Sequence, residues 1–482
     1  MRLLRRENPS SKNVPMLLLL AVAVIEFLFI TLESLFSGIG YYLAENHVIV
    51  PCLLLLGWAL REKQTVFARR RLLLAVAAVS WFVIVQCIHK LSGMENHPMA
   101  TVFLVYLMAF PFAALTDDRD SAGLWRIGGM FVAAALVLAG YTVLLLLDWV
   151  PGGLENHLFW DGARLHALWH PNNAANYFMI GIGFCLAFCV PARKRLTKAL
   201  LLAAAAVQLM AMALTNCRTT LLLTGAMLGG TLFFLIFRGG WKRFVLGLAA
   251  AALVLVGTFQ LSGMFYRWNN ERLLASFQTA QAAAEEPAYP EAVQLAALTL
   301  EEIPTEEVPA AEAPAQEQTE PVILEDTGVI LGDNEQGTLS KDMRTLNGRT
   351  GIWGAALKAI RDSKALMLWG TEYSGTIISA YHPQFPVVHA HNAWMETLMR
   401  MGVPGLLMSL VFTALSVWSA AKLILSAETV LWKKIIAMLA MCVMASGFLE
   451  PYLFITNVYY HVTDFAFFFL TGYLDFWSNR KA

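Results

Sequence analysis

The amino-acid sequence predicts an all-α, polytopic membrane protein with about twelve transmembrane helices. Of its 482 residues, 57% are hydrophobic and only 15% are charged. Apolar runs close to the ~20 residues that a helix needs to cross a bilayer recur along the chain, which excludes a soluble protein. The predicted spans are 16–36, 41–60, 72–91, 99–116, 127–149, 172–190, 199–214, 218–237, 244–262, 404–424, 432–449 and 459–477.

Positive charge predicts the orientation in the membrane. Of the 35 Lys and Arg residues, 23 fall on one side, in both chain ends and in loops after alternate spans. Eight of the other 12 lie in one long loop, to which the positive-inside rule gives little weight. We therefore expect nine spans within 1–262, an extracytoplasmic loop over 263–403 and three spans within 404–482, in a cell membrane with both termini cytoplasmic.

The first predicted span contains two acidic residues, Glu26 and Glu33, on one helix face. A carboxylate at mid-bilayer depth faces the bundle or a wet cavity, so Glu26 is either an ion or proton site or a paired structural acid. The run is long enough to span and has no clear cleavage site, which indicates a signal anchor. Further along, His89 is expected to be a solvated residue of a short outer loop.

Two outer segments carry polar groups at the start of a span. His170 and Asn172 flank Pro171, which can begin the sixth span, and they are candidates to line a substrate site; an interfacial aromatic belt is the alternative. Arg218 stands in the first turn of the eighth span, with Thr215 or Asn216 as the expected cap. A helix start favours anions and a guanidinium matches phosphate oxygens, so Arg218 predicts a phosphate or diphosphate site rather than a lipid-snorkelling residue.

The long outer loop has two parts. Residues 281–340 contain 14 acidic residues, six Pro and no Lys or Arg, a composition that predicts a disordered insert. Order is expected to return with a short helix beginning beside Arg349. A second helix over 391–401, with Glu396 and Arg400 paired at i,i+4, is expected to lie amphipathically at the membrane interface, with His391 and Asn392 at its first turn. Gly402 should break it before the tenth span.

These short blocks, taken in order, resemble the conserved core of the O-antigen ligase and O-antigen polymerase family. The matching residues are Arg349 with Trp353, the Trp369-Gly370 turn, His391-Asn392 with Glu396, the Met401 to Gly405 segment, His170-Pro171-Asn172 and Arg218.

The resemblance implies a metal-independent membrane glycosyltransferase of the GT-C type that needs no cofactor. Such an enzyme takes a glycan from a polyprenyl-diphosphate carrier at the outer leaflet and passes it to a hydroxyl of a glycan, lipid or protein. Arg218 and Arg349 would stabilise the diphosphate and His391 would be the base, because imidazole is suited to take the hydroxyl proton. Asn392 and Glu450 would bind substrate, whereas His389 is expected to be an ordinary loop histidine.

Two other classes stay open. Twelve spans and Glu26 also suit a secondary transporter or a flippase of lipid-linked glycans, although the sequence has no repeated half. A non-catalytic membrane scaffold is the third. The chain has no external basic patch that would indicate a nucleic-acid partner, and its six Cys have neither a disulfide nor a zinc spacing.

Overall fold

The structure is a computed structural model. It describes residues 122–147, 149, 171–237, 239–285, 349–382, 387–451, 453 and 461–479, with parts of 77–93 and the pairs 158–159 and 164–165. This part is almost entirely helical, apart from a small antiparallel hairpin of β1 (Leu158–Phe159) and β2 (Arg164–Leu165).

Hydrophobic runs of the described part form helices, as expected. Five helices of the described part are long and apolar enough to span a bilayer. The helices that follow the predicted spans are α6 (Ala122–Leu146), α7 (Pro171–Cys189), α8 (Arg195–Leu214), α9 (Arg218–Ile236), α10 (Trp241–Glu285), α16 (Ala393–Leu425), α17 (Leu431–Ser446) and α18 (His461–Asn479). The predicted spans 16–36, 41–60 and 99–116, with Glu26, lie outside the described residues.

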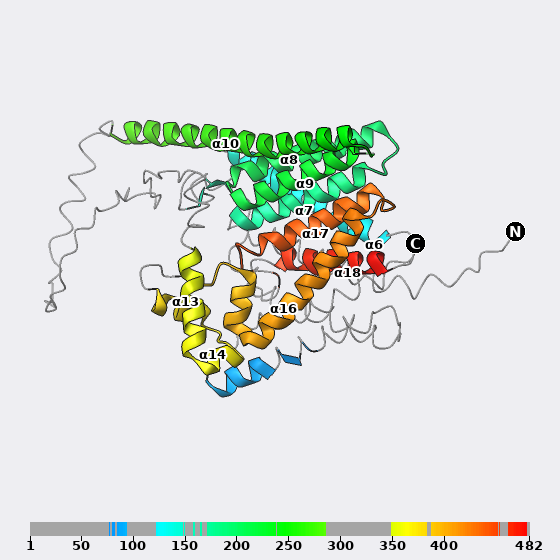
Figure 1. The fold of residues 1–482 in the computed structure, drawn as a ribbon. Helices are drawn as coiled ribbons and strands as arrows, with labels where there is room; N and C mark the ends of the chain where they lie inside the picture. Colours follow the sequence, from blue (N-terminus) through cyan, green and yellow to red (C-terminus); the bar gives the residue numbers. More distant parts are fainter. Residues whose placement is uncertain are drawn as a thin grey trace, which may run out of the picture.

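Helix α10 is longer than the predicted ninth span. It has 45 residues and continues past 262 to Glu285, into the segment that we expected to be loop and insert. The residues after 262 are polar enough to end a hydrophobic run, but the first Pro after that point is Pro287. Because no Pro between them interrupts the backbone hydrogen bonds, the helix continues beyond the end of the hydrophobic run. In Figure 1, α10 runs along one edge of the bundle and extends beyond it.

Helix α7 lies at the centre of the bundle. Fifteen of its 19 residues are buried, and it packs against α6, α8, α9 and α17 (Figure 1). Small residues permit this close packing, since a Cβ at Gly183 would come within 2.8 Å of the Leu439 side chain on α17. Such small-residue contacts are how helices associate in membranes, where the hydrophobic effect gives little drive.

Outside the bundle, three short helices pack on the beginning of α16. They are α13 (Arg349–Asp362), α14 (Lys364–Trp369) and α15 (Ser374–Tyr381). Their shared apolar core is built from one face of each, and includes Ile352, Ala356, Ile360, Ile378, Leu398 and Met399. Figure 1 shows α13 and α14 at one end of the bundle beside α16.

The first part of α16 is buried rather than interfacial. The i,i+4 pair is present, with Arg400 Nε donating to Glu396 Oε1 at 2.6 Å, but Glu396 is only 2% exposed. Trp394, Leu398 and Met401 are buried as well. The prediction of an amphipathic helix exposed at the membrane surface was therefore wrong. Its polar residues face α13 to α15 of the same chain, and Glu396 and Arg400 bind each other where an exposed pair would bind water.

Gly402 separates this part from the rest of α16, as predicted. It has φ 67° and ψ −172°, so the helix is kinked there. Its partner is Gly370, which ends α14 at φ 69°. A Cβ on Gly402 would lie 2.4 Å from Leu368 O, and one on Gly370 would lie 2.3 Å from Arg400 C. The two backbones therefore touch where only glycine fits.

A helical piece near residues 84–91 packs against this kink and corrects the prediction for His89. His89 is fully buried, not solvated. Its Nε2 lies 3.0 Å from Trp369 O and its Nδ1 lies 3.2 Å from Glu372 Oε1. Trp81, which precedes this piece in the chain, stacks on Trp369 with ring centroids 5.2 Å apart. These contacts attach the predicted third span to the outer loop.

Candidate functional site

The start of α16 is hydrogen-bonded to the loop that follows α17. Asn392 is the N-cap, and its Oδ1 accepts from the backbone N–H groups of Trp394 and Met395. Its Nδ2 also donates to Phe448 O at 2.9 Å, and Ala393 N donates to Gly447 O at 2.8 Å. An Asn cap stabilises a helix start, and here it also fixes His391 beside residues 447–451.

Glu450 in this loop joins two predicted site residues from distant elements. Its Oε1 accepts from Asn172 Nδ2 of α7 at 2.6 Å and lies 3.5 Å from an Arg349 nitrogen of α13. Glu450 is 6% exposed and the Arg349 side chain is 18% exposed. The group thus contains a cation, an anion and an amide, partly shielded from water, where electrostatic contacts are stronger than on an open surface.

Helix α13 brings Arg349 close to the histidines. Arg349 begins the helix, and Trp353 lies one turn later. Trp353 Nε1 donates to Ala390 O at 3.0 Å, which fastens this turn to the residue between His389 and His391. The predicted helix start beside Arg349 is confirmed, and its tertiary contact places the guanidinium at the histidine turn.

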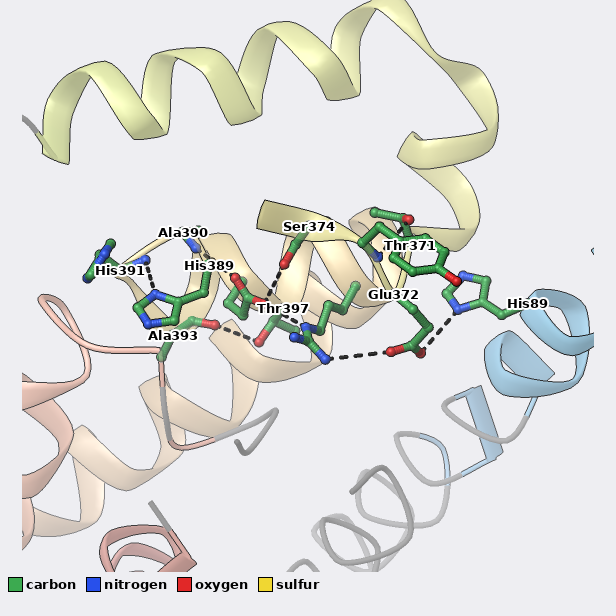
Figure 2. Close-up of polar contacts among 12 residues, drawn as sticks. His89, Thr371, Glu372, Ser374, His389, Ala390, His391, Ala393 and Thr397 are labelled. Atoms are coloured by element: carbon green, nitrogen blue, oxygen red, sulfur yellow. Dashed lines mark hydrogen bonds and ion pairs between the residues drawn. The ribbon is translucent and has the colours of Figure 1, made fainter. Parts of the chain in front are cut away.

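His389 and His391 form a tight pair. His391 N donates to His389 Nδ1 at 3.3 Å, and the two ring centroids are 4.1 Å apart (Figure 2). His391 has φ 50°, in the left-handed region that residues other than Gly adopt uncommonly. Strained backbone of this kind clusters at functional sites. His389, expected to be an ordinary loop residue, is thus part of the same turn.

The charges around His389 favour its neutral form. Burial lowers its pKa; Glu396 opposes this, whereas the positive charges of Arg400 and Arg349 lower it further. The net direction is below the usual histidine pKa, so the ring is unprotonated at neutral pH and able to accept a proton. The effect of Arg349 on this ring also connects the histidine turn with Glu450.

Arg218 lies at the same end of the bundle. It begins α9, as predicted, but the N-cap is Cys217, not Thr215 or Asn216. Thr220 Oγ1, in the first turn of α9, donates to Asn176 Oδ1 at 3.3 Å. Asn176 is one helical turn after Asn172 on α7, so the first turns of both helices face the same side of the membrane.

The sequence-predicted residues therefore fall into three groups. Asn172, Arg349 and Glu450 are in direct contact, and His391 and Asn392 adjoin them through the 447–451 loop. Arg218 reaches this end through the pairing of α7 with α9. His170 lies outside the described residues.

Two residues at this turn were named in the sequence but not predicted to belong to the site: His389, beside His391, and Glu396, which accepts a hydrogen bond from Ala390 N at 2.8 Å. A histidine two residues from the candidate base was the available signal for the first. Among the described residues, no group of three or more His, Cys, Asp or Glu is arranged to hold a metal ion.

Fold and site together define a multi-pass helical membrane protein with a cluster of arginine, histidine, amide and carboxylate groups at one end of its bundle. Residues 203–410 match the family model described as O-Antigen ligase, which confirms the resemblance over that part of the chain. Curated proteins gave no match. The match supports a role in cell-surface polysaccharide assembly, with glycosyltransferase-like activity on lipid-linked glycans.

Proposed function

We propose that this protein transfers a glycan from a polyprenyl diphosphate to an acceptor hydroxyl at the outer leaflet of the membrane. The acceptor is a growing glycan, another lipid or a protein. One observation carries the proposal: Arg349, Glu450 and Asn172, from three separate elements, meet beside the turn that holds His391. A cation to bind a diphosphate and an imidazole to take a proton are the two groups that this transfer requires.

In the proposed reaction, the acceptor oxygen attacks the anomeric carbon of the glycan. The bond from that carbon to the diphosphate oxygen breaks, and the electron pair leaves with the polyprenyl diphosphate. Arg349 and Arg218 stabilise the added negative charge, since guanidinium groups bind phosphate oxygens in a forked geometry. His391 takes the hydroxyl proton as the new bond forms. Asn172, Asn392 and Glu450 hold the substrates and orient Arg349.

The position of the polar groups favours a transferase over a transporter or flippase. Transport sites lie near the bilayer midplane, between repeated halves of a transporter. The residues assigned here begin α7, α9, α13 and α16 or follow the last residue of α17, so they gather at helix ends. Such a site opens at the membrane surface, where a carrier diphosphate lies.

The experiment that tests the proposal is reconstitution with a defined donor. The purified protein receives a polyprenyl-diphosphate oligosaccharide together with candidate glycan, lipid and protein acceptors, and mass spectrometry identifies which one gains sugar. We expect one acceptor to gain the glycan while the polyprenyl diphosphate is released. A donor that stays intact with all three acceptor classes would contradict the proposal.

Replacing Arg218 with Lys tests the forked contact to the diphosphate. Arg218→Lys keeps the charge but loses the planar fork, so we expect turnover to fall on the order of 100-fold. Arg195 offers a matched control, because it also begins a membrane helix, α8, but its side chain is exposed at the opposite end. Arg195→Lys should leave turnover unchanged. Equal rates in both variants would indicate that Arg218 only contacts lipid headgroups.

A further inference from the structure

The backbone around His391 is held at three points. Ala390 N donates to Glu396 Oε2 at 2.8 Å, and Ala390 O accepts from Trp353 Nε1 at 3.0 Å. His391 N donates to His389 Nδ1 at 3.3 Å. Because these bonds use both polar groups of Ala390 and the N–H of His391, they determine the left-handed backbone that directs the His391 side chain.

Glu396 is the only member of this set that brings a charge. It is 2% exposed, and its Oε1 accepts from Ser374 Oγ at 2.7 Å and from Arg400 Nε at 2.6 Å. A carboxylate with hydrogen-bond donors on both oxygens is well compensated for its burial, and each donor fixes its orientation. Glu396 therefore presents Oε2 to Ala390 from a fixed position.

Arg400 also pairs with a second carboxylate, on the side away from the histidine turn. Arg400 lies 3.5 Å from Glu372 Oε2, and Glu372 in turn contacts His89 (Figure 2). Burial disfavours the charged form of Glu372, but hydrogen bonds from His89 and Gln86 and the charge of Arg400 outweigh it and lower its pKa. Glu372 is thus a second buried carboxylate paired with Arg400.

We propose that Glu396 is the positioning residue for His391, holding the imidazole against the diphosphate site by its hydrogen bond to the peptide of Ala390. The inference rests on the proposed function, in which His391 is the base. In this arrangement Glu396 holds the N–H of Ala390 and Trp353 holds its carbonyl oxygen. Glu372 supports Arg400 but does not contact the turn.

The carboxylate has an electrostatic role in the same place. The charged groups acting on His389 are Glu396 and Arg400 from α16 and Arg349 from α13, with His391 adjacent and Glu450 paired to Arg349. Glu396 is the one that raises the pKa of His389. When the charge of Glu396 is removed, the positive charges of Arg400 and Arg349 act on His389 without that opposing negative charge. The His389 imidazole should then protonate only at lower pH.

The experiment compares Glu396→Gln with Glu372→Gln, since each removes a buried carboxylate paired with Arg400. Both should lower the thermal midpoint, so the comparison controls for lost stability. Only Glu396→Gln should lower kcat, on the order of 100-fold with KM for the donor unchanged, because a small misplacement of a reacting group has such an effect. The titration of His389 should move to lower pH in Glu396→Gln, whereas in Glu372→Gln it should stay in place.

Two further variants separate the hydrogen bond from the charge. Glu396→Asp keeps the charge but shortens the side chain, so kcat should fall while the titration of His389 stays where it is in the wild type. Trp353→Phe removes only the Nε1 donor to Ala390 O and should lower kcat in the same direction. If Glu396→Gln fails to fold, Trp353→Phe decides whether fixing the Ala390 peptide matters.

A readout that does not need turnover separates this inference from the proposed function. Diethyl pyrocarbonate modifies neutral imidazole, so its rate on His389, resolved from His391 by fragment-ion mass spectrometry and followed across pH, reports the titration of His389. We expect the midpoint to shift to lower pH in Glu396→Gln and not in Glu372→Gln. Wild-type protein without transfer activity would overturn the proposed function alone. Identical kcat and identical midpoints in the two variants would overturn the role of Glu396.

Discussion

Replacing His391 with Asn should slow glycan transfer by orders of magnitude while leaving the protein folded in the membrane. Asn tolerates the left-handed backbone that His391 adopts at φ 50°, so the fold keeps its turn, but an amide cannot take the hydroxyl proton. General-base catalysis contributes on the order of 10²–10⁴-fold, and we expect a loss of that size in kcat. Single-turnover measurement with a defined polyprenyl-diphosphate oligosaccharide gives the rate.

Binding of the donor and the thermal midpoint are the controls for this variant. Both should match the wild type, because Asn392, Arg349 and Glu450 keep their contacts. His391→Ala removes the base too, but it adds backbone strain at a left-handed position and is the less informative change. Turnover retained in His391→Asn would remove His391 as the base and direct attention to His389, the neighbouring half-buried imidazole.

The helices of the described part were largely predictable because their causes are local. An apolar run close to the thickness of a bilayer forces a helix, and Pro171 starts one because its missing N–H has no partner there anyway. Gly402 ends the first part of α16 for a similarly local reason. Helix α10 departs from this logic, since its end depends on the absence of a breaker after its apolar residues and not on hydrophobicity.

The site was only half predictable, because its defining contacts join residues far apart in the chain. Arg349 and Arg218 stood out as cations at helix starts, but their spacing in sequence says nothing about Glu450 or Asn172 meeting one of them. His89 is the clearest case: beside a short loop it suggests solvation, yet Glu372 and Trp369 bury it from 280 or more residues away. Burial of a polar residue by a distant partner leaves no periodic signal.

The same holds for Glu396. Its i,i+4 pairing with Arg400 is typical of an exposed helix face, and such pairs contribute little when solvated. Once α13 to α15 cover the pair, each charge must be satisfied within the protein, and the carboxylate gains the N–H of Ala390 as a further donor. Packing thus converted a pattern that predicted a surface helix into a fixed support for the histidine turn.

Replacing Gly402 with Ala should unfold the outer assembly, by which we mean α13, α14 and α15 packed on the beginning of α16. Gly402 combines φ 67° with ψ −172°, a region populated almost only by glycine, where another residue costs about 1–3 kcal/mol. A Cβ there would also lie 2.4 Å from Leu368 O, a backbone atom that cannot move without displacing α14. Both effects act together, so the thermal midpoint of the purified protein should drop sharply. Transfer should be lost as well, because the kink sets the direction of the helical segment that Asn392 caps.

Gly354 provides the matched comparison for this substitution. It lies within α13, in the same outer assembly, and a Cβ added to it would meet nothing within 4 Å. Glycine in a helix interior is less favourable than alanine by roughly 0.5–1 kcal/mol, so Gly354→Ala should hold or raise the thermal midpoint. Opposite signs for the two substitutions would separate a required backbone conformation from a general intolerance of added methyl groups. A Gly402→Ala protein as stable as Gly354→Ala would mean that α14 and α16 do not meet through backbone contact.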